Sequence, residues 1–388
     1  MIYSFGARNY FSFKEGLRVS LEFNSKVPKS ISKGRKATTV LGIKGANASG
    51  KTNILKALSF ICGFAADSFS NDEDDDIQLS PFFLSEDPSD FYIDFEIKGV
   101  RYIYSLTATE SCVLKESLHK KINRKTPLIV REKNKLVTRV QEMKELDLIE
   151  LKSNASIIST ALKYKFKSPS EDLFNVSTFF KQVYGNVSPI GALHTDKIFT
   201  VPAVSNFYYH TPEALDFAKK IIISSDLGIT DITIHERTTA QGEKEYFPIF
   251  MHNAGCENGE QRWLISWDES NGTMALYRRL GAYWTALQAG GLLIMDEFDI
   301  HCHNMLLPRL ISLFEDEVTN PHGAQFIFTA HSTEIMDVLG KYRTLLVNKE
   351  CNESYCYRLD EIPGDLIRND RSIATLYREG KIGGNPNL

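Results

Sequence analysis

The stretch TTVLGIKGANASGKTNILKALSFI, residues 38–61, decides the fold class of this chain. It opens with the mostly apolar and β-branched run of residues 38–43, which is typical of a buried strand. Residues 45–52, GANASGKT, then match the pattern G-x-x-x-x-G-K-[ST] in full. A strand, a glycine-containing turn and an amphipathic helix in this order predict a loop that binds phosphate. The apolar side chains of that helix recur on one stripe: Ile54, Leu55, Ala57, Leu58 and Ile61.

The chemistry of this loop depends on residue types that the pattern supplies. Small residues let backbone N–H groups curl around a β-phosphate, and the following helix adds the positive end of its dipole. We expect Lys51 to reach the β- and γ-phosphates and to act in catalysis, and Thr52 to bind Mg²⁺. The alternative, a glycine turn followed by an unrelated lysine, fits this context poorly. The expected nucleotide-binding residues of the loop are Gly45, Asn47, Ser49, Gly50, Lys51, Thr52 and Asn53.

A second apolar run ends in two carboxylates. Residues 291–295, GLLIM, have the character of a buried parallel strand, and Asp296 and Glu297 follow directly. We expect this strand to lie next to the phosphate-loop strand and to direct Asp296 toward Mg²⁺, with Glu297 as the general base that polarises the attacking water. Taken alone, the pattern would equally suit a strand that ends in a polar turn. Downstream of a complete phosphate loop, the metal and base roles are favoured.

Two further segments flank the acidic pair. Residues 269–273, ESNGT, precede a helical segment over residues 274–287. Residues 325–329, QFIFT, form a short apolar run that leads to His331. A histidine at a strand end is usually structural, and the functional interpretation of His331 rests on its position after the other elements.

In this order the motifs resemble those of ABC-type ATPases of the RecF, OLD and structural-maintenance-of-chromosomes groups. The resemblance implies that Ser270 and Gly272 belong to a variant signature motif, which closes on the γ-phosphate held by a second subunit. It also implies that His331 is the switch histidine, which contacts the γ-phosphate.

The resemblance covers residues 1 to about 110 and about 220 to 388, including ARNYFSF at residues 7–13 and YREGKIGG at residues 377–384. The segment after the acidic pair, with Asp299, corresponds to the D-loop, although Cys302 stands where leucine is usual. For the Q-loop, Gln78 is a weak candidate, and a surface glutamine is the alternative.

The predicted fold class is α/β: an ABC-ATPase head of the P-loop NTPase type, with a mixed sheet, flanking helices and a mostly helical insertion. The charged composition of residues 115–151 and the amphipathic patterns at residues 173–183 and 213–222 favour helices in that insertion. The expected division is residues 1–110 for the N-terminal lobe with the phosphate loop, residues 111–245 for the insertion, and residues 246–388 for the C-terminal lobe with the signature, the acidic pair and His331.

Bulk composition sets wide bounds. The 388 residues are 43% hydrophobic with a formal net charge of −4, which does not indicate a nucleic-acid or membrane surface. The six cysteines are scattered, which favours reduced thiols, and no apolar run approaches the roughly 20 residues of a membrane span. We therefore expect a soluble, cytoplasmic protein. His301, Cys302 and His303 are too close in sequence to form a tetrahedral metal site alone.

The resemblance implies an ATPase that converts ATP and water to ADP and phosphate with Mg²⁺. Two heads would sandwich the nucleotide in a homodimer or a higher homo-oligomer, and hydrolysis would release them, so that the protein acts as a nucleotide-driven switch. The chain is most similar to stand-alone AAA-type ATPases of bacterial abortive-infection, or anti-phage, systems, which implies a separate effector protein such as a nuclease or toxin.

Two alternatives remain open at this point. One is a RecF-like DNA-repair ATPase that binds duplex DNA, and the other is an ATP-bound, non-catalytic assembly scaffold. The carboxylate of Glu297 argues against the scaffold. The basic residues that could form a DNA surface, or only a solvated charged face, are Lys120, Lys121, Arg124, Lys125 and Arg131.

Overall fold

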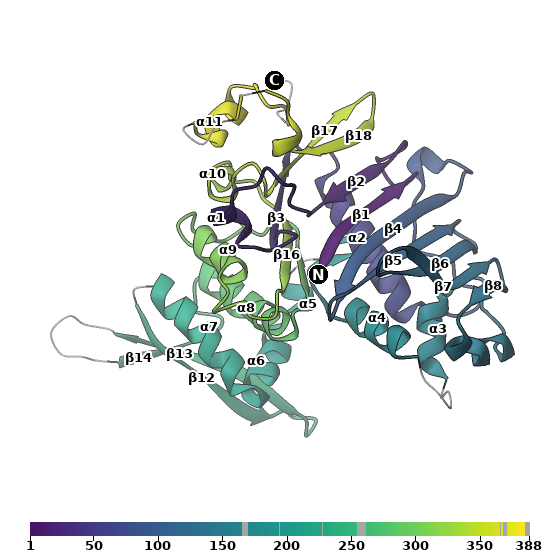
Figure 1. Ribbon diagram of the computed structural model, residues 1–388. Coiled ribbons are helices and arrows are strands. Elements are labelled where there is room, and N and C mark those ends of the chain that lie inside the picture. The colour runs from purple at the N-terminus through teal and green to yellow at the C-terminus, as the bar shows by residue number, and fades with distance from the viewer. Residues whose placement is uncertain are drawn as a thin grey trace.

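A mostly parallel sheet forms the centre of the computed structural model, which describes residues 1–164, 170–193, 195–226, 228–253, 261–364, 366–367 and 371–384 (Figure 1). Its strand order is β18-β17-β3-β16-β15-β9, and every neighbouring pair is parallel except β17 with the edge strand β18. The strands are β3 Val40–Gly45, β9 Val183–Gly185, β15 Leu292–Met295, β16 Gln325–Thr329, β17 Thr344–Glu350 and β18 Glu353–Arg358.

The order of these strands corrects one expectation. The strand before the acidic pair, β15, does not lie next to the phosphate-loop strand β3, because β16 pairs with both and separates them. Hydrophobic pattern identifies a buried strand but does not specify its neighbour. All three strands run parallel, so the segments that follow them still meet at one edge of the sheet.

Strand alternation divides the interior into two cores, one on each face of the central sheet. One core holds Leu41, Ile43, Ile294 and Ile327 together with helix α2 Lys51–Asp67. The other core holds the intervening strand residues, including Val40, Leu293, Phe326 and Phe328, and helices α8 Asn271–Ala289, α9 Leu307–Glu315 and α10 Ile335–Leu339.

An antiparallel sheet of seven strands lies on the other side of α2 (Figure 1). Its order is β2-β1-β4-β5-β6-β7-β8, and its apolar side chains share one core with α2 and the central sheet. The helix that follows the phosphate loop is therefore buried between two sheets. The strands are β1 Ile2–Arg8, β2 Leu17–Ser20, β4 Ser89–Ile97, β5 Val100–Ala108, β6 Val113–Lys121, β7 Lys125–Glu132 and β8 Lys135–Arg139.

The expectation of a mostly helical structure for residues 111–245 is wrong in its first part. Strands β6, β7 and β8 continue the seven-stranded sheet instead. The charged sequence conceals this because Glu116 and Arg131 face each other across β6 and β7 and are both completely buried. The later part does contain helices, α3 Ile157–Lys163, α4 Glu171–Lys181, α6 Val201–His210 and α7 Pro212–Ser225, before strand β12 begins. The division into three domains stays a prediction.

The remaining elements complete the lobe that carries α8. Strands β12 Ile229–Thr238, β13 Lys244–Asn253 and β14 Gln261–Ile265 form a three-stranded antiparallel sheet, and α6 and α7 pack on it.

Cys256 lies outside the described residues, and the other five cysteines are free thiols. Within the described ranges, no helix combines the length and hydrophobicity needed to cross a bilayer. The short elements are α1 Lys29–Ser32, β10 Val187–Ser188, β11 Gly191–Ala192, α5 Thr195–Ile198 and α11 Ile373–Arg378.

Candidate nucleotide site

The phosphate loop connects β3 to α2, and its glycines are required by close contacts. A Cβ atom at Gly45 would lie 2.4 Å from the backbone oxygen of Val347 on β17. Gly50 has a φ of 107°, and a Cβ there would lie 2.6 Å from Ser354 Oγ. Both positions therefore need glycine on steric grounds, as well as for the approach of a phosphate.

Two serines hold the loop from outside. Ser354 Oγ, at the start of β18, donates to the backbone oxygen of Ser49 at 2.6 Å, and it lies 2.7 Å from Ser12 Oγ. Ser12 Oγ also accepts a hydrogen bond from Asn53 Nδ2 at 2.9 Å. The side chain of Asn53, an expected nucleotide-binding residue, is therefore bonded to the N-terminal segment in this structure. Neither serine belongs to the phosphate-loop motif, and the resemblance that includes residues 7–13 assigned no role to Ser12.

The inside of the loop carries groups that suit a phosphate. Ser49 Oγ is buried and has no hydrogen-bond partner among the described residues, which is costly unless a ligand supplies one. Lys51 Nζ folds back over the loop and donates to the backbone oxygens of Gly45 and Ala46 at 3.0 and 2.9 Å. Burial lowers the pKa of Lys51, while Asp296 and Glu297 act to raise it. Asn47 and Ala48 are exposed at the tip of the loop.

The structure brings Asp296 directly to the loop. Thr52 Oγ1 donates to Asp296 Oδ2 at 3.0 Å, and Thr329 Oγ1, at the end of β16, donates to Asp296 Oδ1 at 2.5 Å. A hydroxyl and a carboxylate side by side are hard oxygen donors, the set that Mg²⁺ prefers when phosphate oxygens and water complete its shell. The residues present therefore fit a magnesium ion.

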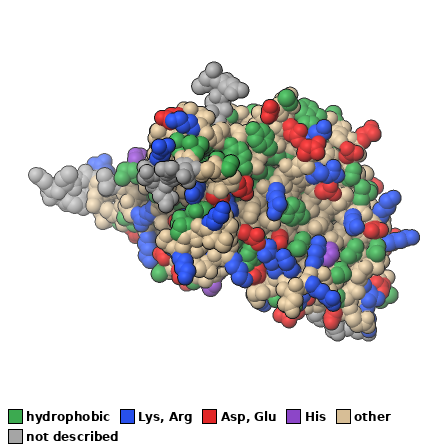
Figure 2. All heavy atoms as spheres, turned by 45° about the horizontal axis from the view of Figure 1, so that its top comes forward, with side chains coloured by type: hydrophobic (Ala, Val, Ile, Leu, Met, Phe, Trp, Pro, Cys, Tyr) green, Lys and Arg blue, Asp and Glu red, His purple; other side chains and the backbone are tan. Residues whose placement is uncertain are grey.

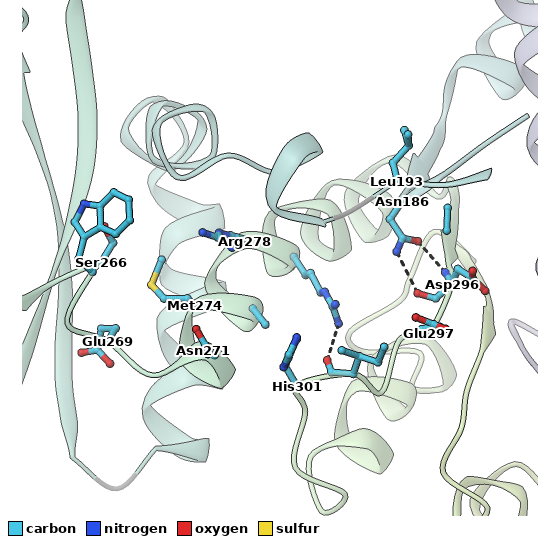
Figure 3. A pocket seen from close by; sticks show the side chains of 15 residues that line it. Asn186, Leu193, Ser266, Glu269, Asn271, Met274, Arg278, Asp296, Glu297 and His301 are labelled. Carbon is cyan, nitrogen blue, oxygen red and sulfur yellow. Dashed lines mark hydrogen bonds between the residues drawn. The ribbon is translucent and has the colours of Figure 1, made fainter. Parts of the chain in front are cut away.

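A buried asparagine fixes the backbone of Asp296 and was not predicted. Asn186, which follows β9, donates through Nδ2 to the Asp296 backbone oxygen at 3.1 Å and accepts the Asp296 N–H at 2.8 Å (Figure 3). Asn186 is 5% exposed. It lies 110 residues before Asp296 and outside any motif, so only the pairing of β9 with β15 reveals the contact.

Glu297 is held in an uncommon backbone conformation beside His331. Its φ is 51°, a left-handed value that is costly for a residue with a Cβ atom and is often found at functional sites. The Glu297 N–H donates to Thr329 Oγ1 at 2.8 Å, and Glu297 Oε1 lies 3.2 Å from His331 Nε2. Both side chains are about half exposed, at 49% and 47%, so a water or a phosphate can reach them.

The loop that carries His331 is fixed through its backbone. Asp299 accepts the N–H groups of His331 and Ser332, at 2.8 and 2.6 Å for its Oδ2 atom. Lys44 Nζ, on the phosphate-loop strand, donates to the backbone oxygen of His331. Burial lowers the pKa of Lys44 to about 8. The three loops that follow β3, β15 and β16 are thus connected to one another by direct hydrogen bonds.

The proposed signature residues lie at the N-terminus of α8. Ser270 is the N-cap residue, and its Oγ accepts the Thr273 N–H at 3.1 Å. A Cβ atom at Gly272 would lie 3.2 Å from the backbone oxygen of His301. None of the hydrogen bonds that Ser270 makes within the described ranges reaches the phosphate loop. Their predicted role, contact with a nucleotide on a second subunit, stays a prediction.

Other candidates from the sequence lie away from this site. Gln78 lines a separate cavity with residues of α2, and no group of three or more His, Cys, Asp or Glu side chains in the described ranges could hold a metal ion. The basic surface is reduced because Arg131 is buried against Glu116 and Lys120 pairs with Asp172. Lys121, Arg124 and Lys125 remain exposed. On the face shown in Figure 2, basic and acidic side chains are intermixed.

A phosphate loop between a parallel strand and a helix, with a strand-end carboxylate bonded to the loop threonine, defines a P-loop nucleoside triphosphatase fold of the ABC/AAA type. The family comparison agrees: the model described as "AAA domain, putative AbiEii toxin, Type IV TA system" matches residues 40–337. The chain belongs to this family, which confirms the predicted fold class and the predicted relationship to ATPases of abortive-infection type.

Among solved structures, one similar chain is titled "Structure of the recombination mediator protein RecF-ATPrS in RecFOR pathway". The likeness has 11% sequence identity and a TM-score of 0.38, and it covers 92% of this chain and 98% of the other. These values are too low to inform function. The comparison with curated proteins found no match.

Proposed function

We propose that this protein is a Mg²⁺-dependent ATP hydrolase. The observation that carries the proposal is the meeting of the phosphate loop, the acidic pair and His331 at one edge of the central sheet. The Thr52 hydroxyl is 3.0 Å from Asp296, and the neighbouring Glu297 carboxylate is 3.2 Å from His331. A phosphate binder, a metal-binding carboxylate, a base and a histidine are the parts that phosphoryl transfer to water needs.

Each residue then has a role that follows from its position. The loop N–H groups and Lys51, once it turns from the loop carbonyls, hold the β- and γ-phosphates. Thr52 and Asp296 would hold Mg²⁺, which supplies charge neutralisation on the phosphate oxygens when bound. Glu297 accepts a proton from the attacking water, and His331 orients Glu297 and contacts the γ-phosphate.

The proposal extends to paired subunits. The α8 N-terminus, with Ser270 and Gly272, offers backbone N–H groups and the positive end of a helix dipole to an anion. Within the described residues, the hydrogen bonds of the Ser270 N–H and hydroxyl are to Glu269 and Thr273 and none reaches the phosphate loop, which favours a nucleotide on a second copy. Binding of ATP would then close two heads, and hydrolysis would open them. The family description supports a role in a toxin–antitoxin or abortive-infection system, in which the heads control a separate effector protein.

Two variants and their controls test the hydrolase. Lys51→Ala should abolish ATP binding, because it removes the mobile cation of the loop, whereas the exposed Lys121→Ala should bind normally. Glu297→Gln should retain ATP and lower turnover by roughly 10²–10⁴-fold, the range of general-base catalysis. Glu317→Gln, at a 65% exposed position, is its control. Wild-type turnover in Glu297→Gln would remove Glu297 from the base role, and absence of nucleotide turnover in the wild-type protein with Mg²⁺ would refute the proposal.

A further inference from the structure

A cavity of 580 Å³ separates the acidic pair from helix α8 (Figure 3). Asp296 and Glu297 line one side of it, with Ile300 and His301. The helix side is lined by residues at helical spacing, which therefore share one face of α8: Asn271, Met274, Ala275 and Arg278. The cavity lies at the edge of the proposed nucleotide site, and the roles proposed above do not use its helix side.

Arg278 is the unexplained group in this cavity. Its Nε atom is buried and has no hydrogen-bond partner among the described residues. The neighbouring Arg279, which also lines the cavity, is anchored through its Nη1 atom, which donates to the backbone oxygens of Phe298 and Ile300, both at 3.2 Å. Leaving a buried N–H of a charged group unpaired is unfavourable, so an acceptor is expected to reach Arg278 in the working state.

The carboxylates that line the cavity are already engaged. Asp296 accepts from Thr52 and Thr329, and Glu297 lies 3.2 Å from His331. Glu269 has a side chain that is 3% exposed and bonded to His252. Among the described residues these carboxylates leave Arg278 Nε without an acceptor, and a ligand from outside the chain would supply one. A planar guanidinium suits the oxygens of a phosphate group, which it can bind with two N–H groups.

The segment formed by β14 and the residues after it, of which Ser266 and Trp267 line the cavity, indicates where this phosphate comes from. Trp263, Ile265 and Trp267 occupy alternate positions on and just after β14 and are 68%, 46% and 90% exposed. Large apolar side chains gathered on a surface mark a site that another protein covers. Trp267 lies three residues before Ser270 and itself lines the cavity, so the same closure that brings Ser270 to a second copy would cover these apolar side chains.

We propose that Arg278 binds a phosphate oxygen of the nucleotide held by a second copy of the chain. The proposal rests on the paired-subunit function proposed above and adds to it a specific cation. Arginine at this position stabilises the negative charge that develops on the γ-phosphate oxygens, and its buried Nε gains the acceptor that the described part of the chain does not provide. An arginine supplied across an interface contributes roughly 10³–10⁵-fold to turnover, and we expect a loss of that order without it.

The first test separates turnover from nucleotide binding. Arg278→Met should lose turnover by that factor while a single subunit still binds ATP normally, because its own phosphate loop is intact. Arg278→Lys, which keeps the charge without the two-pronged geometry, should recover part of the loss. Arg237→Met is the control, since Arg237 is an exposed arginine that pairs with Glu245 on the neighbouring strand. Unchanged turnover in Arg278→Met would overturn the proposal. Thermal unfolding of each variant checks that the fold is intact.

The second test asks on which subunit Arg278 acts. Mixing Arg278→Met with Lys51→Ala should restore about one quarter of the wild-type rate, because random pairing gives half heterodimers with one complete site each. Failure to recover activity would overturn the proposal if Ser270→Arg mixed with Lys51→Ala does recover it, since composite sites would then exist without Arg278. Failure of both mixtures would instead refute the paired-subunit function and, with it, this role of Arg278.

Discussion

Replacement of Asn186 by alanine tests whether the backbone of the acidic pair must be fixed. The side chain satisfies both the N–H and the C=O of Asp296, at 2.8 and 3.1 Å, and it is 5% exposed. Alanine would leave two buried backbone groups without partners, at about 1–2 kcal/mol each, so the free energy of unfolding should fall by about 2–4 kcal/mol. Because Asp296 is also the proposed metal ligand, the Mg²⁺ concentration for half-maximal turnover should rise about 10–100-fold.

Asn320 provides a matched control for this variant. It is 1% exposed and likewise bridges backbone groups, donating to the oxygens of Phe314 and Ala324 and accepting the Ala324 N–H. Asn320→Ala should therefore lose a similar amount of stability in urea unfolding and keep the wild-type Mg²⁺ dependence. If Asn186→Ala shows an unchanged Mg²⁺ requirement, or the same change as Asn320→Ala, the positioning argument fails.

Two further predictions concern buried charges. Arg131→Met should lower the free energy of unfolding by about 3–5 kcal/mol in urea titration, because it leaves the Glu116 side chain, which is 0% exposed, without its ion-pair partner. Adding Glu116→Gln should restore part of the lost stability. Equal stability of Arg131→Met and the wild type would contradict this prediction. Lys44 has a pKa of about 8 when folded, below the ordinary 10.5, because of burial and Lys51, opposed by Asp299 and Glu334. Between about pH 8 and 10.5 the unfolded chain therefore binds more protons than the folded chain, so the free energy of unfolding should rise with pH in this window relative to Lys44→Met. ATP affinity should weaken above about pH 8, because the positive charge of Lys44 beside the loop is lost. Parallel pH profiles for the two proteins, in unfolding and in ATP titration, would contradict both expectations.

The sequence predicted the parts of the site that depend on local pattern. The phosphate loop, Asp296 and His331 each follow a short apolar run, and the ends of parallel strands lie at one edge of a sheet. That rule places the three segments together without knowledge of strand order, so the incorrect placement of β15 beside β3 did not change the expected site. Thr52 contacts Asp296 because the segments that follow β3 and β15 meet at this edge of the sheet.

The residues that fix these segments could not be predicted in the same way. Asn186, Ser12 and Ser354 act through single contacts between segments that are far apart in the chain. The strands β6 to β8 were missed for a different physical reason. Glutamate and arginine occur both in buried ion pairs and on exposed charged surfaces, so residue type alone cannot distinguish Glu116 and Arg131 from their solvated neighbours.

The serine contacts connect the seven-stranded sheet to the phosphate loop. Ser12 follows β1 of that sheet, and it bonds Asn53 of α2 and Ser354 of β18. Ser354 in turn bonds the backbone of Ser49 inside the phosphate loop. The same two layers also share one hydrophobic core around α2, which starts at Lys51. Because Ser354 bonds both the Ser49 backbone and Ser12, a change in the loop backbone at Ser49 on nucleotide binding would alter a contact that also holds the turn between β1 and β2.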